Sequence, residues 1–372
     1  MPVLDADAHV EESLATFADP YWDPAYASQR PYVVPRGENA AWVIEDRLWP
    51  KLQGPGAQFF ASPASIDGRP TALSRRKAER NGDVLESAEL TDVDARLRQM
   101  DAEGIHLQVL YPTLFLGHPL AEDVGLGNAL VRSYNSWLAA VCARRPARLK
   151  WVCVVNLDDV PGACAELRRC KRELGAVGVM VLGMAGDRKL DQPAFEPFWA
   201  EAETLDLAVA VHIGWPSPTF LHLFDNVYDS QTVALYSSLF IGFVDIVAGG
   251  VLDRHPRLRV AFLEAGTDWL PFWLGRMEHR AGAVGPFYGY AAKRQPSEYL
   301  RGGQLYFGCE IDDRLLPQMA ELVGPEYLLF ASDIPHADRE KDAAAELMGR
   351  TDLPETTRQL ILSENTARFY GL

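Results

Sequence analysis

The sequence predicts an α/β protein in which eight parallel strands alternate with helices and close into a (β/α)8 TIM barrel. The first observation is length, because 372 residues suit one barrel domain, 1–372, that carries insertions. The second is a set of eight short apolar segments, mostly continuous runs, which are typical of parallel strands buried on both faces. The third is the helical spacing of apolar residues between these segments, which predicts βαβ units.

The predicted strands run from the N-terminus almost to the C-terminus. They cover residues 3–10, 105–112, 149–157, 176–183, 208–214, 258–266, 305–310 and 327–335. Helices between them are predicted at 159–174, 194–205, 312–323 and 338–349, each with apolar or small residues at helical spacing. Eight such units close a barrel more naturally than an open sheet, so we expect the active site at the C-terminal ends of the strands.

One long aromatic-rich insertion follows the first strand. It covers residues 13–90, far more than the usual βα loop of roughly 2–6 residues. Its aromatic content disfavours a disordered linker; the residues are Tyr21, Trp22, Tyr32, Trp42, Trp49, Phe59 and Phe60. Because it leaves the C-terminal end of a strand, we expect it at the catalytic face, either as a pocket wall or lid, or as a subunit interface or extra packing layer.

The composition disfavours several classes of partner. The formal net charge of −15 disfavours nucleic acid and anionic membrane surfaces, which repel an acidic protein. The apolar stretch 233–252 is interrupted by Asp245, so we expect a buried helix there rather than a membrane span. The five cysteines form no C-x-x-C pair, and the N-terminus does not resemble a signal peptide. We therefore expect a cytoplasmic protein with a small-molecule substrate, assembled as a homodimer or higher homo-oligomer.

Two polar side chains close the first predicted strand. Asp7 and His9 are two residues apart, and side chains alternate along a strand, so both lie on one face together with Asp5. From inside a barrel, Asp7 and His9 could hold one ion. The pattern D-x-H is common by chance, however, and alone it is equally typical of a polar strand end.

Two further strands end in a similar way. His212 closes the apolar run of the fifth strand, where a buried imidazole needs a partner. Asp333 ends the eighth, where a buried carboxylate needs a cation or several hydrogen-bond donors. Each residue alone is more typical of a hydrogen-bonded core position. Together with Asp7 and His9 they meet at the catalytic face, and this convergence predicts a metal site.

These residues and their surroundings resemble a known family. Asp7-Ala8-His9, His212 and the segment 331–336, Ala-Ser-Asp-Ile-Pro-His, are similar to the amidohydrolase-related branch of the amidohydrolase superfamily. That branch includes aminocarboxymuconate semialdehyde decarboxylase and resorcylate-type decarboxylases. Segments 109–113, 249–256 and 364–370 extend the resemblance over nearly the whole chain, and it is weakest in the insertion.

The resemblance implies one divalent metal ion, usually zinc or manganese, held by Asp7, His9, His212 and Asp333. Mixed imidazole and carboxylate ligands suit Zn²⁺, Mn²⁺ or Fe²⁺ and leave a position for water or substrate. The implied activity is decarboxylation or hydrolysis of a small aromatic carboxylate or amide, in which Asp333 relays the proton.

The sixth strand departs from the family pattern. The decarboxylases commonly carry a histidine there, whereas this chain has Glu264. A carboxylate can act as a general base or acid, which favours hydrolysis, whereas the family resemblance favours decarboxylation. Glu264 could also be a further ligand, which would leave room for a second ion.

Other residues are candidates for catalysis or substrate binding. His336 follows Asp333 closely and could line the pocket as a catalytic group. Arg276 could orient Glu264 or the substrate, although a structural ion pair fits it as well. Trp215 opens a second long segment, 215–230, that is also expected at the barrel mouth.

Three more histidines could be either functional or structural. His118 follows the second strand and could reach the substrate, although a loop-surface position fits it better. His255 and His106 fall at the opposite end of the barrel and are expected to be structural.

Two other functions remain open. One is a dinuclear oxygen-activating enzyme on the same fold, with Glu264 bridging to a second iron or manganese ion; no further set of ligands is visible to support it. The other is a barrel that binds a ligand without catalysis. Such a protein would be expected to lose ligands, yet all four predicted ones are present.

Overall fold

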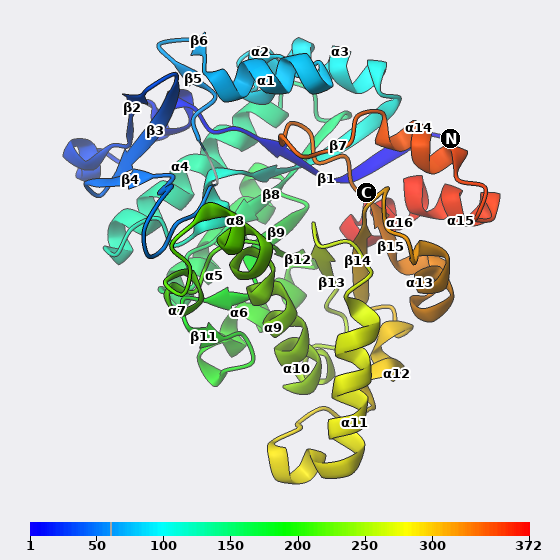
Figure 1. Ribbon diagram of the computed structural model, residues 1–372. Helices are drawn as coiled ribbons and strands as arrows, with labels where there is room; N and C mark the ends of the chain where they lie inside the picture. Colours follow the sequence, from blue (N-terminus) through cyan, green and yellow to red (C-terminus); the bar gives the residue numbers. More distant parts are fainter. Residues whose placement is uncertain (60–61) are drawn as a thin grey trace.

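The computed structural model describes residues 1–59 and 62–372, apart from the side chain of Pro286 (Figure 1). Phe60, one of the aromatic residues expected in the insertion, lies outside the described residues. Eight parallel strands form one sheet in the order β1-β7-β8-β9-β12-β13-β14-β15, and helices surround it. The predicted (β/α)8 barrel is thereby confirmed.

All eight predicted strands are present. Their bounds are β1 Val3–Val10, β7 Ile105–Pro112, β8 Leu149–Val154, β9 Gly178–Leu182, β12 Ala208–His212, β13 Val260–Leu263, β14 Leu305–Cys309 and β15 Leu328–Phe330. Just beyond β15 the chain meets β1 again, because Asp333 N donates to Asp7 O at 3.1 Å and His9 N donates to Ile334 O at 2.6 Å. These two bonds bring the last segment of the barrel against the first.

The larger helices pack on the outside of the barrel. They are α3 Val93–Ala102, α4 Val124–Cys142, α5 Val160–Arg169, α6 Glu196–Thr204, α9 Leu235–Ala248, α11 Leu270–Tyr288, α13 Leu316–Val323, α14 Ala343–Gly349 and α16 Asn365–Tyr370. The helices expected from 312 and 338 begin later than predicted. Pro317 occupies the first turn of α13, a position that suits proline because the first amides need no intrahelical acceptor. The chain before α14 is instead a loop that carries Arg339.

Short helical turns and one strand pair complete the part of the chain after the insertion. They are η3 Leu114–Gly117, η4 Cys170–Leu174, β10 Met184–Ala185, β11 Arg188–Lys189, η5 Pro193–Phe195, α7 Pro218–Leu221, α8 Val227–Asp229, η6 Ser230–Ala234, α10 Val251–Arg254, α12 Pro296–Leu300, η7 Pro325–Tyr327, α15 Glu355–Gln359 and η8 Leu360–Glu364. The run Val227–Ala248 is long and apolar enough to cross a membrane by length and composition, and half of its most apolar window is buried in the protein. Its last part, α9, packs against β9 and β12 as an ordinary barrel helix does.

The insertion forms a small structure of its own at one end of the barrel, drawn in blue in Figure 1. It contains η1 Leu14–Phe17, η2 Pro24–Gln29, the antiparallel sheet β2 Tyr32–Arg36, β3 Asn39–Ile44 and β4 Arg47–Trp49, the pair β5 Ser65–Ile66 and β6 Arg69–Pro70, then α1 Ala72–Asn81 and α2 Leu85–Ala88. Phe17 packs edge-on against Trp22 and Trp42, with ring centroids 5.9 and 5.6 Å apart. These buried rings give the segment its own apolar centre.

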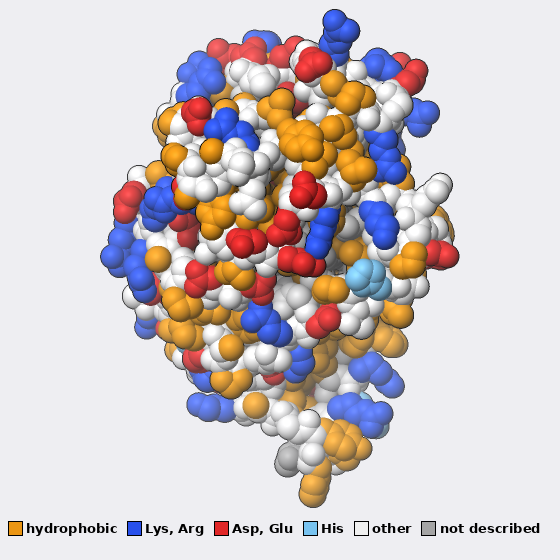
Figure 2. Space-filling view, turned by 90° about the vertical axis from the view of Figure 1, so that its left-hand side faces the viewer, with side chains coloured by type: hydrophobic (Ala, Val, Ile, Leu, Met, Phe, Trp, Pro, Cys, Tyr) orange, Lys and Arg blue, Asp and Glu red, His pale blue; other side chains and the backbone are white. Residues whose placement is uncertain are grey.

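The surface carries charges of both signs side by side (Figure 2). Helix α11 extends away from the barrel at the bottom of Figure 1, and its far end exposes Phe287 and Tyr288. This protrusion is separate from the strand ends at which the polar residues gather.

Candidate metal centre

The ends of the strands carry the polar side chains that the sequence singled out. On β1, Asp5, Asp7 and His9 alternate with buried alanines, so all three carry their side chains on the same face. Asp5 lies deepest and is held by its neighbours, accepting hydrogen bonds from Ser332 Oγ at 2.5 Å and Gln108 Nε2 at 3.0 Å. Asp7 and His9 lie nearer the mouth and are free to face another partner.

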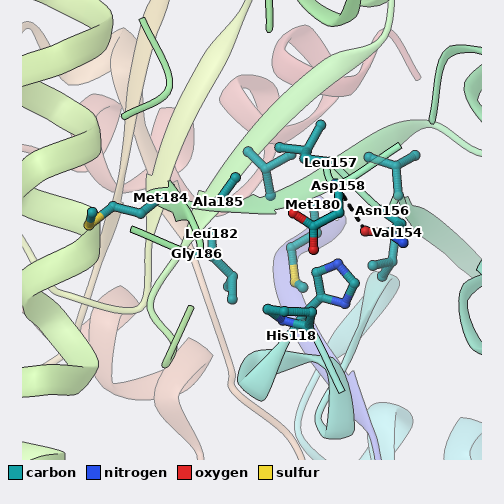
Figure 3. A pocket seen from close by; sticks show the side chains of 13 residues that line it. His118, Val154, Asn156, Leu157, Asp158, Met180, Leu182, Met184, Ala185 and Gly186 are labelled. Atoms are coloured by element: carbon teal, nitrogen blue, oxygen red, sulfur yellow. Dashed lines mark hydrogen bonds between the residues drawn. The ribbon is translucent and has the colours of Figure 1, made fainter. Parts of the chain in front are cut away.

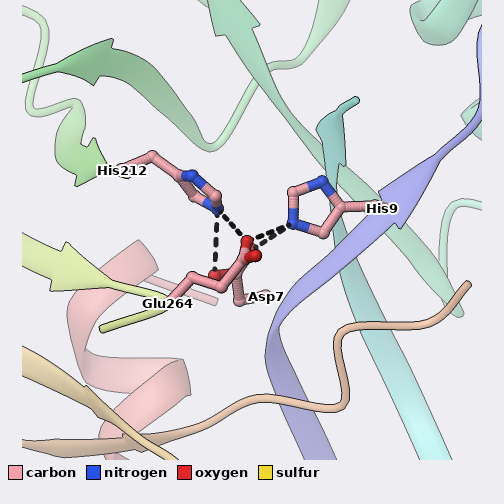
Figure 4. Close-up of side chains that lie close together, drawn as sticks. All are labelled: Asp7, His9, His212 and Glu264. Carbon is pink, nitrogen blue, oxygen red and sulfur yellow. Dashed lines mark ion pairs between the residues drawn. The ribbon is translucent and has the colours of Figure 1, made fainter. Parts of the chain in front are cut away.

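Four side chains converge from three strand ends (Figure 4). His212 Nε2 lies 3.4 Å from Asp7 Oδ2 and 2.9 Å from Glu264 Oε2. His9 Nε2 lies 3.4 Å from Asp7 Oδ1 and 3.3 Å from Glu264 Oε2. One ligand atom from each of the four residues lies within 4.8 Å of the others. The spacing is that of a set of atoms grouped around one ion.

Both histidines present a defined nitrogen to this group. Nδ1 of His9 lies 2.9 Å from the carbonyl oxygen of Pro112, and Nδ1 of His212 lies 3.0 Å from that of Ile213. A carbonyl only accepts, so each Nδ1 donates its proton, and in the neutral ring the lone pair is on Nε2. This hydrogen bond to the second nitrogen is the usual way in which proteins orient a metal-binding imidazole.

The inner atoms of the group lack hydrogen-bond partners among the described residues. They are both carboxylate oxygens of Asp7, Nε2 of His9, Nε2 of His212 and Oε2 of Glu264. Burying several unpaired acceptors in one place costs several kcal/mol unless a cation satisfies them. The atoms present therefore fit a divalent metal ion, and the mixed nitrogen and oxygen set suits zinc, manganese or iron.

The electrostatics of the group favour ionised carboxylates. Burial would raise the pKa of Glu264, but the adjacent imidazoles of His212, His336 and His9 hold it well below its ordinary value. Burial likewise opposes ionisation of Asp7, whose pKa is nevertheless lowered by His212 and His9. Both carboxylates are thus held in the ionised form that binds a cation.

Asp333 and His336 form a second group beside the first. His336 Nδ1 lies 2.5 Å from Asp333 Oδ1, and its Nε2 lies 3.0 Å from Thr113 Oγ1. Asp333 Oδ1 is 3.5 Å from His9 Nε2. The two groups share His9 and Glu264, and Nε2 of His9 has one lone pair, which can bind one ion. The arrangement therefore favours a single ion.

Two of these carboxylates stand on unusual backbone. Glu264 has a φ of 59° and Asp333 a φ of 53°, the left-handed region that side-chain-bearing residues rarely adopt. Each such residue costs about 1–2 kcal/mol. In both cases the residue stands just after a strand, where the turn aims its carboxylate at the same place. Strain kept at a strand end is a mark of functional positions.

A buried arginine that sequence reasoning missed supports the site through the backbone of β1. Arg96 on α3 donates to the carbonyl oxygen of His9 at 2.8 Å and to Gln108 Oε1 at 3.1 Å. Gln108 in turn donates to Asp5. A charged residue in an amphipathic helix normally faces solvent, so only the folded arrangement shows that Arg96 fixes the backbone of β1.

A cavity of about 410 Å³ opens above the group, a volume that suits one small ligand. Glu264, His336 and Thr113 line it on the side of the barrel, and Trp215 stands among its apolar residues. The insertion supplies another part of the wall, through Phe59, Ser62, Leu73, Lys77 and Arg80. An adjoining cavity of about 340 Å³ is acidic, and there burial and the charges of Asp333 and Glu264 raise the pKa of Glu310 well above its ordinary value.

Two of the candidate residues lie apart from this cavity. His118 lines a separate cavity of about 20 Å³ with Asn156 and Met180, where burial lowers its pKa to about 4 (Figure 3). Arg276 is exposed on α11, next to a surface hollow between α9 and α11. The structure thus brings together Asp7, His9, His212, Glu264, Asp333 and His336, with Trp215 in the cavity wall, but not His118 or Arg276.

Two further histidines, which the sequence places at the opposite end of the barrel, lie away from the C-terminal strand ends. His255 follows α10 and its Nε2 lies 2.9 Å from Glu196 Oε1. His106 is exposed near the start of β7. Neither lines the cavity among its described residues.

Comparison with known proteins identifies relatives along most of the chain. The model of the amidohydrolase family matches residues 90–372. A gamma-resorcylate decarboxylase from Rhizobium radiobacter is 30% identical over 291 residues, which cover 75% of this chain and 87% of the relative. A 2-amino-3-carboxymuconate-6-semialdehyde decarboxylase from Dictyostelium discoideum is 26% identical over 289 residues, covering 76% of this chain and 77% of the relative.

Solved structures agree with the fold. An amidohydrolase from Mycobacterium avium subsp. paratuberculosis K-10 has a TM-score of 0.79 at 20% identity and covers 100% of this chain and 98% of its own. A 2,6-dihydroxybenzoate decarboxylase from Rhizobium has a TM-score of 0.67 at 26% identity, covering 86% and 99%. A dihydroxybenzoic acid decarboxylase from Polaromonas sp. JS666, solved with manganese and 2-nitroresorcinol, has a TM-score of 0.66 at 24% identity, covering 81% and 94%.

Proposed function

Because the chain belongs to the amidohydrolase family, we propose that it is a metal-dependent decarboxylase of small aromatic acids. The observation that carries the proposal is the group of unpartnered buried atoms on Asp7, His9, His212 and Glu264, at the floor of a cavity large enough for one substituted ring. Two relatives that match most of the chain are decarboxylases, and one of them acts on the aromatic acid gamma-resorcylate. Their chemistry, together with this site, favours carbon dioxide release over amide hydrolysis.

Asp7, His9, His212 and Glu264 would hold the ion, with Asp333 beside them. Manganese is the first candidate because it is present in the related Polaromonas decarboxylase, and zinc suits the same ligands. When bound, the ion supplies positive charge that anchors the oxygen atoms of an acidic substrate. Glu264 thus has the role of a ligand in this proposal, and the hydrolytic role that its sequence position suggested becomes the alternative.

Asp333 and His336 would handle the proton. Burial and the Glu264 charge raise the pKa of Asp333 to about 6, and the short contact to His336 Nδ1 lets the two share one proton. In the reaction the ring carbon that bears the carboxyl group takes a proton from this pair. The bond from that carbon to the carboxyl carbon then breaks, its electrons restore the aromatic ring, and CO₂ leaves. One proton from solvent resets the pair.

The test is a direct measurement of CO₂ from 2,6-dihydroxybenzoate by the manganese-loaded protein, before and after removal of the metal by a chelator. We expect release that stops with chelation and returns with Mn²⁺. Hydrolysis of amide or ester substrates without release of CO₂ would contradict the proposal and favour Glu264 as a base.

We further propose that the protein is a cytoplasmic homodimer. Its five cysteines are free and buried, as suits a reducing compartment, and Phe287 and Tyr288 at the end of α11 offer apolar surface to a second copy. Light scattering during gel filtration should give about twice the chain mass. A monomer at micromolar concentration would refute the assembly and leave the chemistry untouched.

A further inference from the structure

One face of α1 turns its side chains into the active-site cavity. Leu73, Lys77 and Arg80 follow one another at helical spacing, and all three line the cavity. The helix belongs to the insertion, before residue 90, where the family match begins. Its three cavity residues thus stand outside the barrel strands whose ends form the metal-binding floor.

Lys77 is an unusual residue for such a wall. Its side chain is only 7% exposed, and its Nζ forms an ion pair with Glu11, whose side chain is 6% exposed. Glu11 also lines the cavity, and its Oε2 has no hydrogen-bond partner among the described residues. A buried lysine carries three N–H donors, so the pair leaves donors that a further acceptor can use. Desolvating this ammonium is costly unless it serves such a partner.

The ion pair stands close to the strand that carries part of the floor, because Glu11 follows His9 by two residues along the chain. Glu11 and Glu264 line the same cavity of about 410 Å³, a volume that suits one substituted aromatic ring. Apolar side chains, among them Trp215, Leu116 and Ile213, also line the cavity. The cavity therefore combines a metal-binding floor, apolar surface and a wall with two basic side chains, each of which has an acidic neighbour in Glu11 or Glu340.

The charges of the cavity point the same way. Asp7, Glu264 and Asp333 place three carboxyl groups at or beside the floor, and one divalent ion together with the proton shared by Asp333 and His336 only just offsets them. An acidic substrate needs additional positive charge, and among the described lining residues Lys77 and Arg80 are the only lysine and arginine. Arg80 stands at the rim, with 55% of its side chain exposed, and donates to the carbonyl oxygen of Ala337 at 3.2 Å. It ties α1 to the loop that carries His336.

We propose that Lys77, assisted by Arg80, binds a second anionic group of the substrate, so that this enzyme selects aromatic acids with a carboxylate or similar group distant from the reacting one. The inference rests on the proposed function for the substrate class, but its test uses binding alone. In the absence of substrate, Glu11 occupies one donor of Lys77 and keeps the ammonium in place. A substrate anion then takes the remaining donors.

The experiment compares isophthalate, which carries two carboxylates, with benzoate, which carries one, by titration calorimetry on the manganese-loaded full-length protein. Wild type should bind isophthalate at least about 10-fold more tightly than benzoate, since a charge-assisted hydrogen bond contributes a factor of about 10 to 100. Lys77→Met should remove this preference while benzoate affinity changes less than about threefold. Arg76→Met, an exposed residue of the same helix, is the matched control and should change neither.

Two variants separate recognition from a purely structural role. Glu11→Gln should tighten isophthalate binding severalfold, because it removes the competing carboxylate and retains an acceptor for Lys77. The double variant Glu11→Gln with Lys77→Met leaves no unpaired charge and should lose the preference even if Lys77→Met alone fails to fold. Equal affinity of wild type for the two acids, or an unchanged preference in the double variant, would overturn the proposal. Absence of CO₂ release with retained preference would instead refute only the decarboxylase function.

Discussion

The floor and the wall of the cavity are built in different ways. The floor consists of residues at the ends of barrel strands, each held by main-chain hydrogen bonds such as that from Asp333 N to Asp7 O. The wall formed by α1 belongs to an insertion with a separate aromatic centre around Phe17 and Trp42. The difference indicates that the barrel strands carry the proposed metal ligands, whereas the insertion adds side chains that line the ligand cavity.

The largest effect is expected at the floor. His212→Ala removes a ligand whose Nδ1 is fixed by Ile213, so metal content and activity should be lost together, with activity falling at least about 1,000-fold. Elemental analysis and CO₂ release measure the two quantities. His279→Ala, an exposed histidine on α11, is the control and should keep both. Full activity in the His212 variant would contradict the assignment of His212 and its neighbours as metal ligands.

Glu264→Gln should weaken metal affinity more than about 100-fold, because an amide oxygen replaces an ionised ligand that faces both histidines. Competition with a chromogenic chelator measures the affinity, and the exposed Glu321→Gln serves as the comparison. Unchanged metal affinity with turnover lowered by about 10²–10⁴ would make Glu264 a base or acid. If metal and turnover both survive, Glu264 is structural.

Asp333→Asn should lower kcat by about 10²–10⁴ with most of the metal retained, because the pair with His336 can no longer share a proton. Metal content measured alongside the rate decides the role. Loss of the ion to the same extent as in Glu264→Gln would place Asp333 among the ligands, as the sequence suggested.

Trp42→Ala tests whether the wall folds around its own centre. Removing this buried ring should lower the free energy of unfolding by about 3–5 kcal/mol, measured by urea denaturation. The folded fraction should keep its metal, since the floor does not depend on the insertion. Loss of metal from folded protein would show that floor and wall are one unit.

The smallest effect is expected for Arg276→Ala. Its side chain is exposed on α11 and does not line the active-site cavity, so kcat and KM should change less than about twofold. A KM increase of about tenfold would instead support the substrate-binding role that the sequence suggests for Arg276.

The sequence predicts the floor better than the wall for a physical reason. Strands buried on both faces leave continuous apolar runs, and a charged residue that ends such a run stands out, as His212 and Asp333 do. The strand predicted at 327–335 is longer than β15, which ends at Phe330; no apolar pattern reports this end or the later turn at the positive φ of Asp333. The choice between base and ligand for Glu264 depended on distances to His9 and His212 that only the fold supplies.

The sequence allows for a pocket wall formed by the insertion, but it does not predict the charged residues of that wall. Helix α1 is rich in basic residues, which is typical of a solvent-exposed surface helix. Its sequence therefore does not predict that Lys77 is buried. Its meaning depends on Glu11, 66 residues earlier, and on the packing of the insertion over the barrel mouth. Arg96 is hidden for the same reason, because its acceptor is a main-chain oxygen 87 residues away.

The seam between the first strand and the last segment of the barrel has a consequence for biosynthesis. Asp5 and Ser332 meet there although 327 residues separate them, and the ligands on β1 lie next to the turn that carries Asp333. In a chain still emerging from the ribosome, Asp7 and His9 are made first. The metal site also needs His212 at the end of β12, Glu264 after β13 and the turn after β15, so it forms only when nearly the whole chain has been synthesised. Tight capture of an ion therefore reports that synthesis and barrel closure are complete, and a truncated product that lacks the final strand has no assembled centre with which to retain metal.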